Sequence, residues 1–296
     1  MQAPPSAEVL DVPSASASHR AVNGVTLHVV EAGDPDDPLV VLLHGFPEFW
    51  YEWREYVEPF VDAGYRVLVP DQRGYARSEK PGRVCDYRVG TLVEDVASLV
   101  RSEGRETAHV VGHDWGAMVA WELARRRPEL LDRLGIVNVP HPRAFRRAIR
   151  SNPAQLRKSW YALSFQIPRL PEWLIRLGDY DALESAMRDG ARPGTFDPTE
   201  FERYRTAWRQ DGALKATLDW YRAFVRCYDA APRDRIDAPT LVLWGEHDQA
   251  LVPELASASL AFCADGRLER FPDATHWVPH EYPERITAHL LAHLDG

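Results

Sequence analysis

The stretch Gly112-His113-Asp114-Trp115-Gly116 follows an apolar run, Ala108-His109-Val110-Val111, and precedes a helix-like segment that ends at Arg127. A strand, a sharp turn and a helix in this order are typical of a nucleophile elbow, which usually carries serine. Here the position holds Asp114. A serine alkylated at a saturated carbon becomes an ether that resists water, whereas an alkylated aspartate becomes an ester whose carbonyl water can attack. The turn therefore predicts displacement at an sp³ carbon followed by ester hydrolysis.

Continuous apolar runs alternate with helical stretches on both sides of this turn. A run such as 39–43 (LVVLL) is expected of a strand buried on both faces. Strands are predicted at 25–31, 39–43, 65–69, 108–111, 134–137 and 240–244, and helices at 53–63, 91–102 and 115–127. The alternation predicts an α/β fold with a mostly parallel central sheet flanked by helices.

The alternation stops after Val139-Pro140 and resumes near residue 238. Residues 140–231 are rich in Arg, Trp and Tyr and contain no strong buried-strand run, so we expect an inserted helical cap. The α/β core would then comprise residues 19–139 and 232–296. Residues 1–18, rich in Pro, Ala and Ser, are predicted to form a flexible N-terminal arm. They lack the basic start and apolar core of a secretory signal.

Composition narrows the class of protein. The 296 residues carry a net charge of −9, which argues against a nucleic-acid partner. No apolar run approaches the ~20 residues of a membrane span. Cys85, Cys227 and Cys263 are odd in number and far apart, so we expect no metal site, no disulfide framework and a cytoplasmic location. No cofactor is expected, and the sequence leaves monomer and homodimer both open.

Two more residues complete a nucleophile–base–acid arrangement with Asp114. Asp248 follows the apolar run 240–244, where α/β sheets place functional groups. Glu246 and His247 are alternatives in the same loop, although the spacing favours Asp248. His276 lies in a loop before the final helix, so the order nucleophile, acid, histidine matches that of hydrolases with this elbow. We expect His276 to deprotonate water and Asp248 to fix its tautomer and stabilise the imidazolium.

The loop His44-Gly45-Phe46-Pro47 directly follows the LVVLL run. In a fold with this elbow, that loop supplies one oxyanion donor and the residue after the nucleophile supplies the other. We therefore predict an oxyanion hole made by the backbone N–H groups of Phe46 and Trp115. It would hold the charge that develops when water attacks the Asp114 ester.

These motifs together resemble the epoxide hydrolases of the α/β-hydrolase superfamily, from about residue 19 onward. The segment 44–48 is similar to that family's HGFPE motif and the segment 112–116 to its GHDWG elbow. The segment 71–75 resembles the family's DxRGYG turn, but Ala76 replaces the last glycine. His276-Trp277 is similar to the family's His-Trp pair.

The resemblance also implies a pair of cap tyrosines that hold the epoxide oxygen. Trp160-Tyr161, followed by the segment 165–168 (FQIP), is similar to the setting of the first, and Asp219-Trp220-Tyr221-Arg222 to that of the second. Ring opening develops an alkoxide, which leaves poorly unless it is hydrogen-bonded or protonated. Tyrosine, with a pKa near ~10, is a donor at neutral pH.

The substrate implied by these features is a small, apolar epoxide that reacts with water. The aromatic-rich cap favours an apolar, aryl-bearing molecule. We expect Trp115, Phe165 and Trp277 to line the substrate pocket. Trp160 and Trp220 are expected to wall the pocket or to pack beneath it.

Two other functions compete with epoxide hydrolysis. A dehalogenase uses the same elbow aspartate, but haloalkane dehalogenases typically carry Asn where Phe46 lies, and fluoroacetate dehalogenases carry Arg where Trp115 lies. A non-catalytic ligand-binding protein on this fold would commonly lose a triad member, whereas all three are present here. Asp114 at the elbow excludes a serine esterase. Tyr161 and Tyr221 favour the epoxide.

Overall fold

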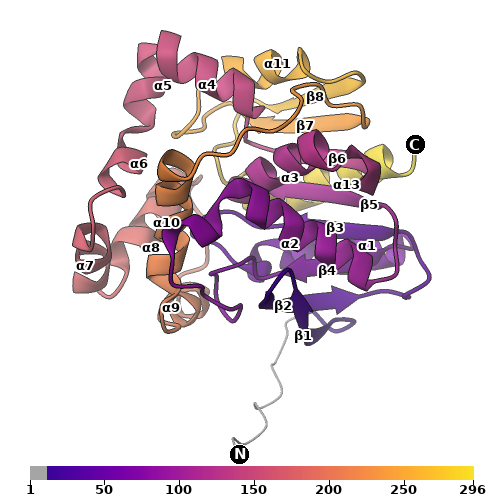
Figure 1. Cartoon of the computed structure of the whole chain (residues 1–296), viewed down its shortest axis with the longest axis horizontal. Coiled ribbons are helices and arrows are strands. Elements are labelled where there is room, and N and C mark those ends of the chain that lie inside the picture. The colour runs from indigo at the N-terminus through magenta and orange to yellow at the C-terminus, as the bar shows by residue number, and fades with distance from the viewer. Residues whose placement is uncertain (1–11) are drawn as a thin grey trace, which may run out of the picture.

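Eight strands form one sheet in the computed structural model, which describes residues 12–296. The strand order is β1-β2-β4-β3-β5-β6-β7-β8 (Figure 1). Strands β1, β2 and β4 pair in antiparallel fashion, and the pairs from β4 to β8 are parallel, so the mostly parallel α/β sheet predicted from the sequence is confirmed. The strands are β1 (Ser16–Val22), β2 (Val25–Ala32), β3 (Leu39–Leu43), β4 (Arg66–Pro70), β5 (Ala108–His113), β6 (Leu131–Val137), β7 (Thr240–Gly245) and β8 (Gly266–Phe271).

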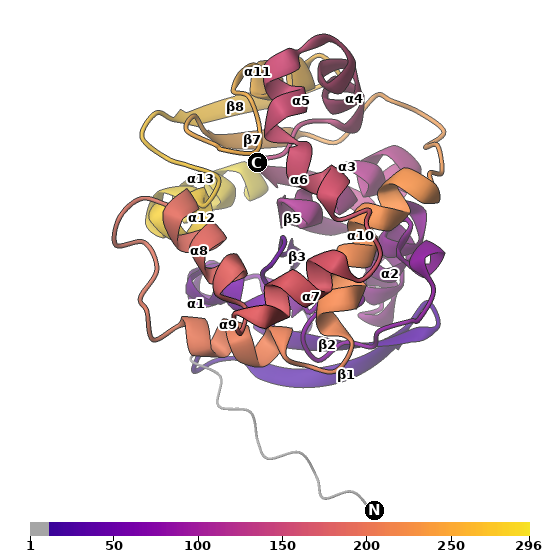
Figure 2. The same ribbon diagram turned by 90° about the vertical axis from the view of Figure 1, so that its left-hand side faces the viewer.

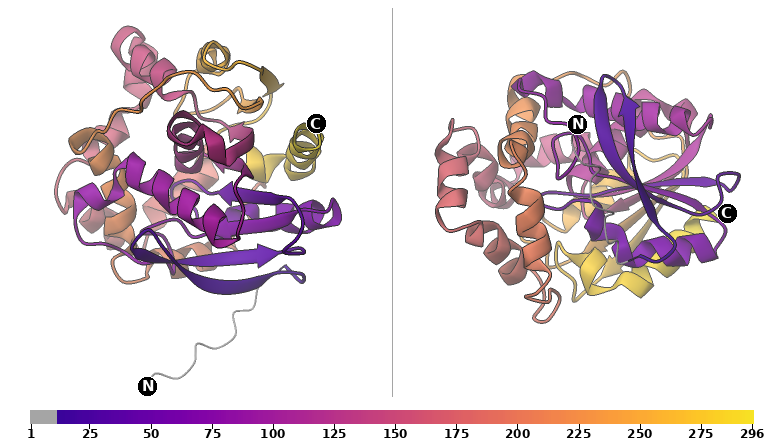
Figure 3. Two further views of the ribbon diagram at one scale, coloured as in Figure 1. Left: turned by 45° about the vertical axis from the view of Figure 1, so that its right-hand side comes forward. Right: turned by 90° about the horizontal axis from the view of Figure 1, so that it is seen from below.

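Strand β3 explains why the central strands are apolar at every position. Val41 and Leu43 pack in one buried cluster with residues of α2 (Val89–Ser102) and α3 (Trp115–Arg126). Val40 and Leu42 pack in a second cluster with residues of α1 (Arg54–Asp62) and α13 (Pro283–Leu294). Successive side chains of a strand point to opposite faces, so a sheet covered by helices on both faces needs apolar residues throughout. Figure 3 shows these two helical layers on either side of the sheet.

Two strands were not predicted from the sequence. Strand β1 begins at Ser16, so the last residues of the predicted N-terminal arm belong to the sheet, while residues 1–11 lie outside the described part of the chain. Strand β8 lies at the opposite edge and alternates half-buried with exposed residues until Phe271. Edge strands are covered less completely than central ones, so neither of these two shows the continuous apolar run by which the inner strands were recognised.

Seven helices connect β6 to β7. They lie together beyond one end of the strands, on the left in Figure 1 and toward the viewer in Figure 2. We call them the cap. They are α4 (Pro142–Ser151), α5 (Pro153–Lys158), α6 (Trp160–Ser164), α7 (Leu170–Leu177), α8 (Asp181–Gly190), α9 (Phe201–Trp208) and α10 (Ala213–Arg226). The remaining short elements are α11 (Glu254–Leu260), α12 (Val278–Glu281) and the 3₁₀ helices η1 (Trp50–Trp53), η2 (Val84–Tyr87) and η3 (Pro128–Leu130).

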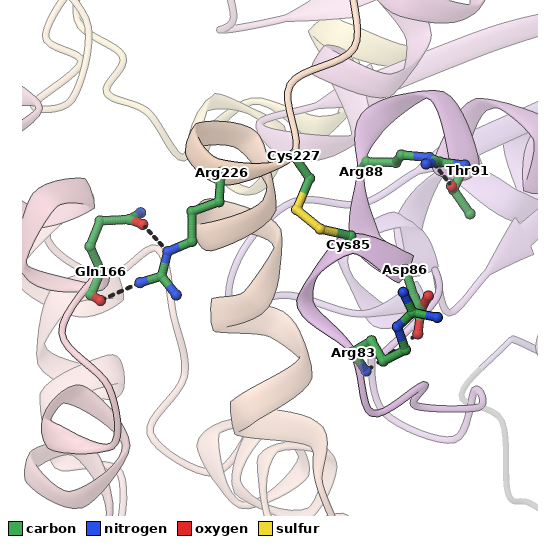
Figure 4. Close-up of a disulfide and its surroundings, with 8 residues drawn as sticks. All are labelled: Arg83, Cys85, Asp86, Arg88, Thr91, Gln166, Arg226 and Cys227. Atoms are coloured by element: carbon green, nitrogen blue, oxygen red, sulfur yellow. Dashed lines mark hydrogen bonds between the residues drawn. A yellow bond between two sulfur atoms is a disulfide. The ribbon is translucent and has the colours of Figure 1, made fainter.

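A disulfide joins the cap to the core and corrects the prediction that the cysteines form none. Cys85 of η2 is bonded to Cys227, which follows the last turn of α10, with their Cα atoms 5.5 Å apart (Figure 4). The two are separated by 142 residues, and sequence spacing cannot show that the fold brings them together. Cys263 remains a free thiol. The cytoplasmic location loses the support that it drew from the cysteines and stays a prediction.

None of the helices within residues 12–296 has both the length and the apolar character needed to cross a membrane.

Candidate active site

Asp114 occupies the sharp turn between β5 and α3. Its backbone adopts φ 47° and ψ −120°, a conformation that a residue with a side chain rarely takes. The Asp114 carbonyl accepts a 3.0 Å hydrogen bond from the Met118 N–H, so the helix begins directly at the turn. The turn directs the carboxylate toward the loop after β3 and toward the loop that carries His276.

Three glycines allow the backbones around the elbow to approach each other. A Cβ on Gly116 would lie 2.0 Å from the Leu43 carbonyl oxygen, and one on Gly112 would lie 2.4 Å from the backbone of Gly116. A Cβ on Gly45 would lie 2.4 Å from the Cβ of Asp114. Only glycine fits these positions, which explains why two of them flank the aspartate in the sequence.

We expect Gly116→Ala to lower the free energy of unfolding by about 3 kcal/mol or more, because the new methyl group meets backbone that cannot move aside. Gly82→Ala is the matched control, since nothing lies within 4 Å of a Cβ at that position. It should change stability by less than about 0.5 kcal/mol. Urea unfolding followed by circular dichroism measures both, and equal stabilities of the two variants would contradict this packing.

The loop after β3 holds one oxygen of the Asp114 carboxylate. The Phe46 N–H donates a 2.8 Å hydrogen bond to Asp114 Oδ1. Trp115 is the first residue of α3, so its N–H has no acceptor within the helix. Both groups expected to form the oxyanion hole therefore lie beside Asp114. The Phe46 N–H contacts Asp114 in the structure. The role of the Trp115 N–H as the second oxyanion donor stays a prediction.

His276 lies between the two carboxylates that the sequence placed around it. Its Nδ1 is 2.7 Å from Asp248 Oδ2, and its Nε2 is 3.5 Å from Asp114 Oδ2. The other Asp248 oxygen, Oδ1, accepts hydrogen bonds of 2.7 Å and 2.9 Å from the N–H groups of Ala250 and Leu251. These bonds fix the carboxylate, which in turn orients the imidazole with Nε2 facing Asp114.

The charges of His276 and Asp114 each shift the pKa of the other residue. Burial acts to lower the pKa of His276, but the charge of Asp248 and hydrogen bonds with both carboxylates outweigh it and raise the pKa well above the usual histidine value. Burial acts to raise the pKa of Asp114, but the hydrogen bond and charge of His276 lower it below the usual aspartate value. Both shifts favour the charged pair, a carboxylate next to an imidazolium.

Asn138 organises the triad in a way that sequence reasoning missed. Its Nδ2 donates to Asp248 Oδ2 at 3.1 Å and to the Thr275 carbonyl at 2.9 Å, and its Oδ1 accepts from the Gly245 N–H at 2.6 Å. One amide thus joins the ends of β6 and β7 to the loop before His276. The sequence shows an asparagine directly after a buried strand, but it does not show which loops that side chain joins.

Glu52 makes a second connection that was not predicted. Its Oε2 accepts a 2.8 Å hydrogen bond from the Gly45 N–H, and its Oε1 is 2.7 Å from His113 Nδ1. The other ring nitrogen of His113 is 2.9 Å from the His276 carbonyl. The pair therefore ties the Phe46 loop to the His276 loop beneath Asp114.

Two cap tyrosines line a cavity together with Asp114. Tyr161 on α6 and Tyr221 on α10 have ring centroids 6.0 Å apart, and both line a cavity together with Asp114 and His276. The cavity volume is about 640 Å³, including space open to solvent. The rest of its wall is mainly apolar, with Met118, Val139, Phe145, Ala162, Phe224 and Leu251. An apolar pocket with a few convergent polar groups is typical of a site for a small, apolar molecule.

Both tyrosines are held in the protonated form. Burial and then the charges of Asp114 and Asp248 raise the pKa of Tyr161 above the usual tyrosine value. Burial, Tyr161 and Asp114 likewise raise the pKa of Tyr221. Each hydroxyl is therefore a hydrogen-bond donor at neutral pH.

The aromatic residues expected around the pocket take different places. Trp115 lines the cavity, as expected. Phe165 is not among the lining residues and instead packs its ring against Tyr161 and Tyr221, with centroids 5.8 Å and 5.0 Å away. Trp277 also lies outside the lining and is buried against Phe196.

Trp160 and Trp220 were expected to wall the pocket or to pack beneath it. The expectation for Trp160 is wrong, whereas Trp220 packs beneath the pocket. Trp160 points to solvent with 66% of its surface exposed, because on the short helix α6 the neighbouring Tyr161 takes the inward position. Trp220 is fully buried beneath the site, where its ring contacts Trp115 and its Nε1 donates to the Arg73 carbonyl at 3.0 Å.

The fold and this group of residues define a class of protein. Residues 38–283 match the model of the alpha/beta hydrolase fold family. The chain is similar to the AB hydrolase superfamily protein YfhM of Bacillus subtilis, at 44% identity over 92% of this chain and 95% of that protein. The chain is thus an α/β hydrolase.

Other relatives narrow the class to one family. Epoxide hydrolase 1 of Caenorhabditis elegans is 36% identical over 92% of this chain and 68% of that protein. Epoxide hydrolase A of Mycobacterium tuberculosis is 32% identical over 93% and 95%. The crystal structure of an epoxide hydrolase mutant from Bacillus megaterium superposes with a TM-score of 0.85 at 27% identity, over 94% of this chain and all of that one. The chain belongs to the epoxide hydrolase family.

Proposed function

We propose that this protein hydrolyses an apolar epoxide to a vicinal diol in two steps, through a covalent ester on Asp114. Family membership supports the reaction. The observation that carries the mechanism is the cavity in which the Asp114 carboxylate and the Tyr161 and Tyr221 side chains converge. A nucleophile on one wall and two proton donors on the other match the two demands of epoxide opening.

In the first step, Asp114 attacks a ring carbon of the epoxide. The Phe46 N–H already holds Oδ1 at 2.8 Å, which leaves Oδ2 as the attacking oxygen. As the C–O bond of the ring breaks, Tyr161 and Tyr221 donate hydrogen bonds to the departing oxygen, and a proton from one of them leaves it as a hydroxyl. The product is a hydroxyalkyl ester of Asp114.

In the second step, water attacks the carbonyl carbon of that ester. Ester formation removes the negative charge of Asp114 and with it one of the groups that raise the pKa of His276. The imidazole can then release its proton, which restores the hydroxyl of the tyrosine that protonated the epoxide oxygen, and act as the base for water, while Asp248 keeps it oriented. The N–H groups of Phe46 and Trp115 hold the developing oxyanion on Oδ1, and the diol leaves with Oδ2.

The same cavity argues against the competing functions. A halide leaves without a proton, so a dehalogenase has no use for two tyrosines that remain protonated. A ligand-binding protein has no use for an imidazole held between two carboxylates. The aspartate, the histidine and the tyrosines act together only in the opening of an epoxide ring and the hydrolysis of the ester that results.

An assay panel of styrene-type epoxides, aliphatic epoxides and haloalkanes tests the proposal. We expect diol from the epoxides and no halide release from the haloalkanes, with faster turnover of aryl-bearing epoxides because the cavity wall is largely apolar and aromatic. Halide release without diol formation would show that the protein is a dehalogenase instead.

The two steps should differ in their pH dependence. The pKa of Asp114 is lowered and the pKa values of the tyrosines are raised, so the groups that open the ring keep their active forms across the neutral range. Hydrolysis needs neutral His276, so its rate should fall as the pH drops through the pKa of His276 in the ester. Quenched-flow mass spectrometry should therefore show more covalent adduct at acidic than at basic pH. An adduct fraction that rises with pH would contradict this assignment.

A further inference from the structure

We propose that the outer face of the cap, formed by α5, α6 and α7, docks the protein on an anionic lipid surface. The composition and the exposure of this face support the docking, which does not depend on the catalytic mechanism. Helices α5 to α7 follow one another along the left edge of the molecule in Figure 1, and the same edge faces the viewer in Figure 2.

Large apolar side chains gather on this face. Within the described residues, eight of the ten exposed large hydrophobic side chains lie between positions 156 and 177. Those on α6 and α7 form what we call the apolar patch: Trp160, Leu163, Leu170, Trp173, Leu174 and Leu177. Exposed apolar residues that occur singly are normal on a protein surface, whereas a cluster of this size marks a contact surface.

Helix α7 shows that the patch arises from the orientation of the helix. Pro171 and Ile175 are buried against the cap, while Leu170, Trp173, Leu174 and Leu177 repeat at a spacing of three and four residues on the outer side. Trp173 and Leu177 have 57% and 68% of their surface exposed. A helix on the surface of a protein normally turns its apolar stripe inward, so an outward stripe needs another partner.

The charge around the patch identifies the chemistry of that partner. Residues 142–177 contain eight Arg and Lys residues and one acidic residue, Glu172, for a net charge of +7. The whole chain carries −9, so all other residues together carry −16. A strongly cationic segment in an acidic protein predicts attraction to a negatively charged surface.

Five arginines of this segment have no partner within the described residues that would hold them away from such a surface, whereas Arg143 is paired with Asp234 and Arg146 contacts Tyr228. Glu172 is already paired with Arg222 of α10. Among residues 12–296, no ion pair or side-chain hydrogen bond involves the side chains of Arg147, Arg150, Arg157, Arg169 and Arg176, and all five are exposed. Arginines beside exposed tryptophans and leucines are the composition of a segment that lies in the interface of an anionic bilayer.

A lipid surface fits better than a second copy of this chain. A symmetric dimer through the patch would bring two +7 segments together, and their repulsion would oppose association. A bilayer offers hydrocarbon for the tryptophans and leucines and anionic headgroups for the arginines at the same time. Tyr161 and Ala162 on α6 line the catalytic cavity, so docking would bring the site close to apolar molecules dissolved in the membrane.

Vesicle sedimentation tests the proposal with the full-length protein and without substrate. Wild type should bind vesicles of equal phosphatidylcholine and phosphatidylglycerol, bind phosphatidylcholine vesicles weakly, and dissociate in high salt. Arg157→Glu/Arg176→Glu should lower the partition coefficient on the anionic vesicles at least ~30-fold, because each arginine contributes about 1 kcal/mol. Trp173→Ser/Leu177→Ser should lower it by about tenfold or more.

Arg101→Glu/Arg267→Glu is the matched control, because it makes the same charge change at exposed positions on α2 and β8 of the core. It should bind like wild type. All variants should turn over a small dissolved epoxide at the wild-type rate when no vesicles are present, which separates docking from catalysis and shows that each variant is folded.

Three results would overturn the proposal. The first is absence of wild-type binding to the anionic vesicles. The second is an equal loss of binding in the core control and the patch variants. The third is a dimer in sedimentation velocity that Trp173→Ser/Leu177→Ser abolishes, because the patch would then be an interface between copies.

Discussion

His276→Gln is expected to stop the enzyme after its first step and to leave the substrate attached to Asp114. Ring opening uses the carboxylate and the tyrosines, so it should continue without the imidazole. Ester hydrolysis loses its general base, and turnover should fall by about 10²–10⁴-fold. Glutamine is neutral and retains a hydrogen-bonding side chain between Asp114 and Asp248, the two groups that contact His276. Intact-mass measurement after exposure to an epoxide should show one added substrate mass.

The control for this experiment removes the nucleophile as well. Asp114→Ala/His276→Gln should show no added mass, and peptide mapping of the single variant should locate the adduct on the elbow peptide. An unmodified His276→Gln protein that has also lost turnover would contradict the assignment of ring opening to Asp114 and of ester hydrolysis to His276.

Tyr161→Phe combined with Tyr221→Phe is expected to abolish ring opening almost completely. The double variant keeps the shape and apolar surface of the cavity but removes both proton donors, so the alkoxide would have to leave unprotonated. We expect ester formation to slow at least ~10³-fold, with a smaller loss in each single variant because the second hydroxyl remains. Stopped-flow quenching of tryptophan fluorescence or mass spectrometry of the adduct measures the rate.

Tyr228→Phe is the matched control for the tyrosine pair. Tyr228 also follows the cap helices but is exposed, with its ring beneath Arg146 and away from the cavity lining. It should open epoxides at the wild-type rate. Epoxide opening at the wild-type rate in the Tyr161/Tyr221 double variant would contradict the role of these two tyrosines as proton donors.

Much of the fold could be predicted because buried parallel strands have a clear signature. The continuous apolar run at 39–43 and those like it identified the central strands, and Asp114 between a strand and a helix located the elbow. Edge strand β8 was missed because its exposed side chains are polar. The Cys85–Cys227 disulfide was missed because spatial proximity across 142 residues leaves no trace in sequence spacing.

In the candidate site, too, only residues with a recognisable position in the sequence could be predicted. The structure places Asp114, His276 and Asp248 in contact, and each had a recognisable position at the end of a strand or in a terminal loop. Asn138 and Glu52 could not be assigned, because their roles depend on which loops lie beside them after folding. Trp160 was misplaced for a related reason, since the orientation of a helix as short as α6 follows from packing rather than from its own periodicity.

A single turnover in ¹⁸O-labelled water tests the covalent mechanism most directly. With enzyme in excess over epoxide, we expect a diol that contains no solvent oxygen, because its new hydroxyl carries Oδ2 of Asp114. The solvent label should appear instead in the Asp114 carboxylate, detectable in the elbow peptide by mass spectrometry. Label in the diol with none in Asp114 would show direct attack of water on the epoxide and would contradict the ester intermediate.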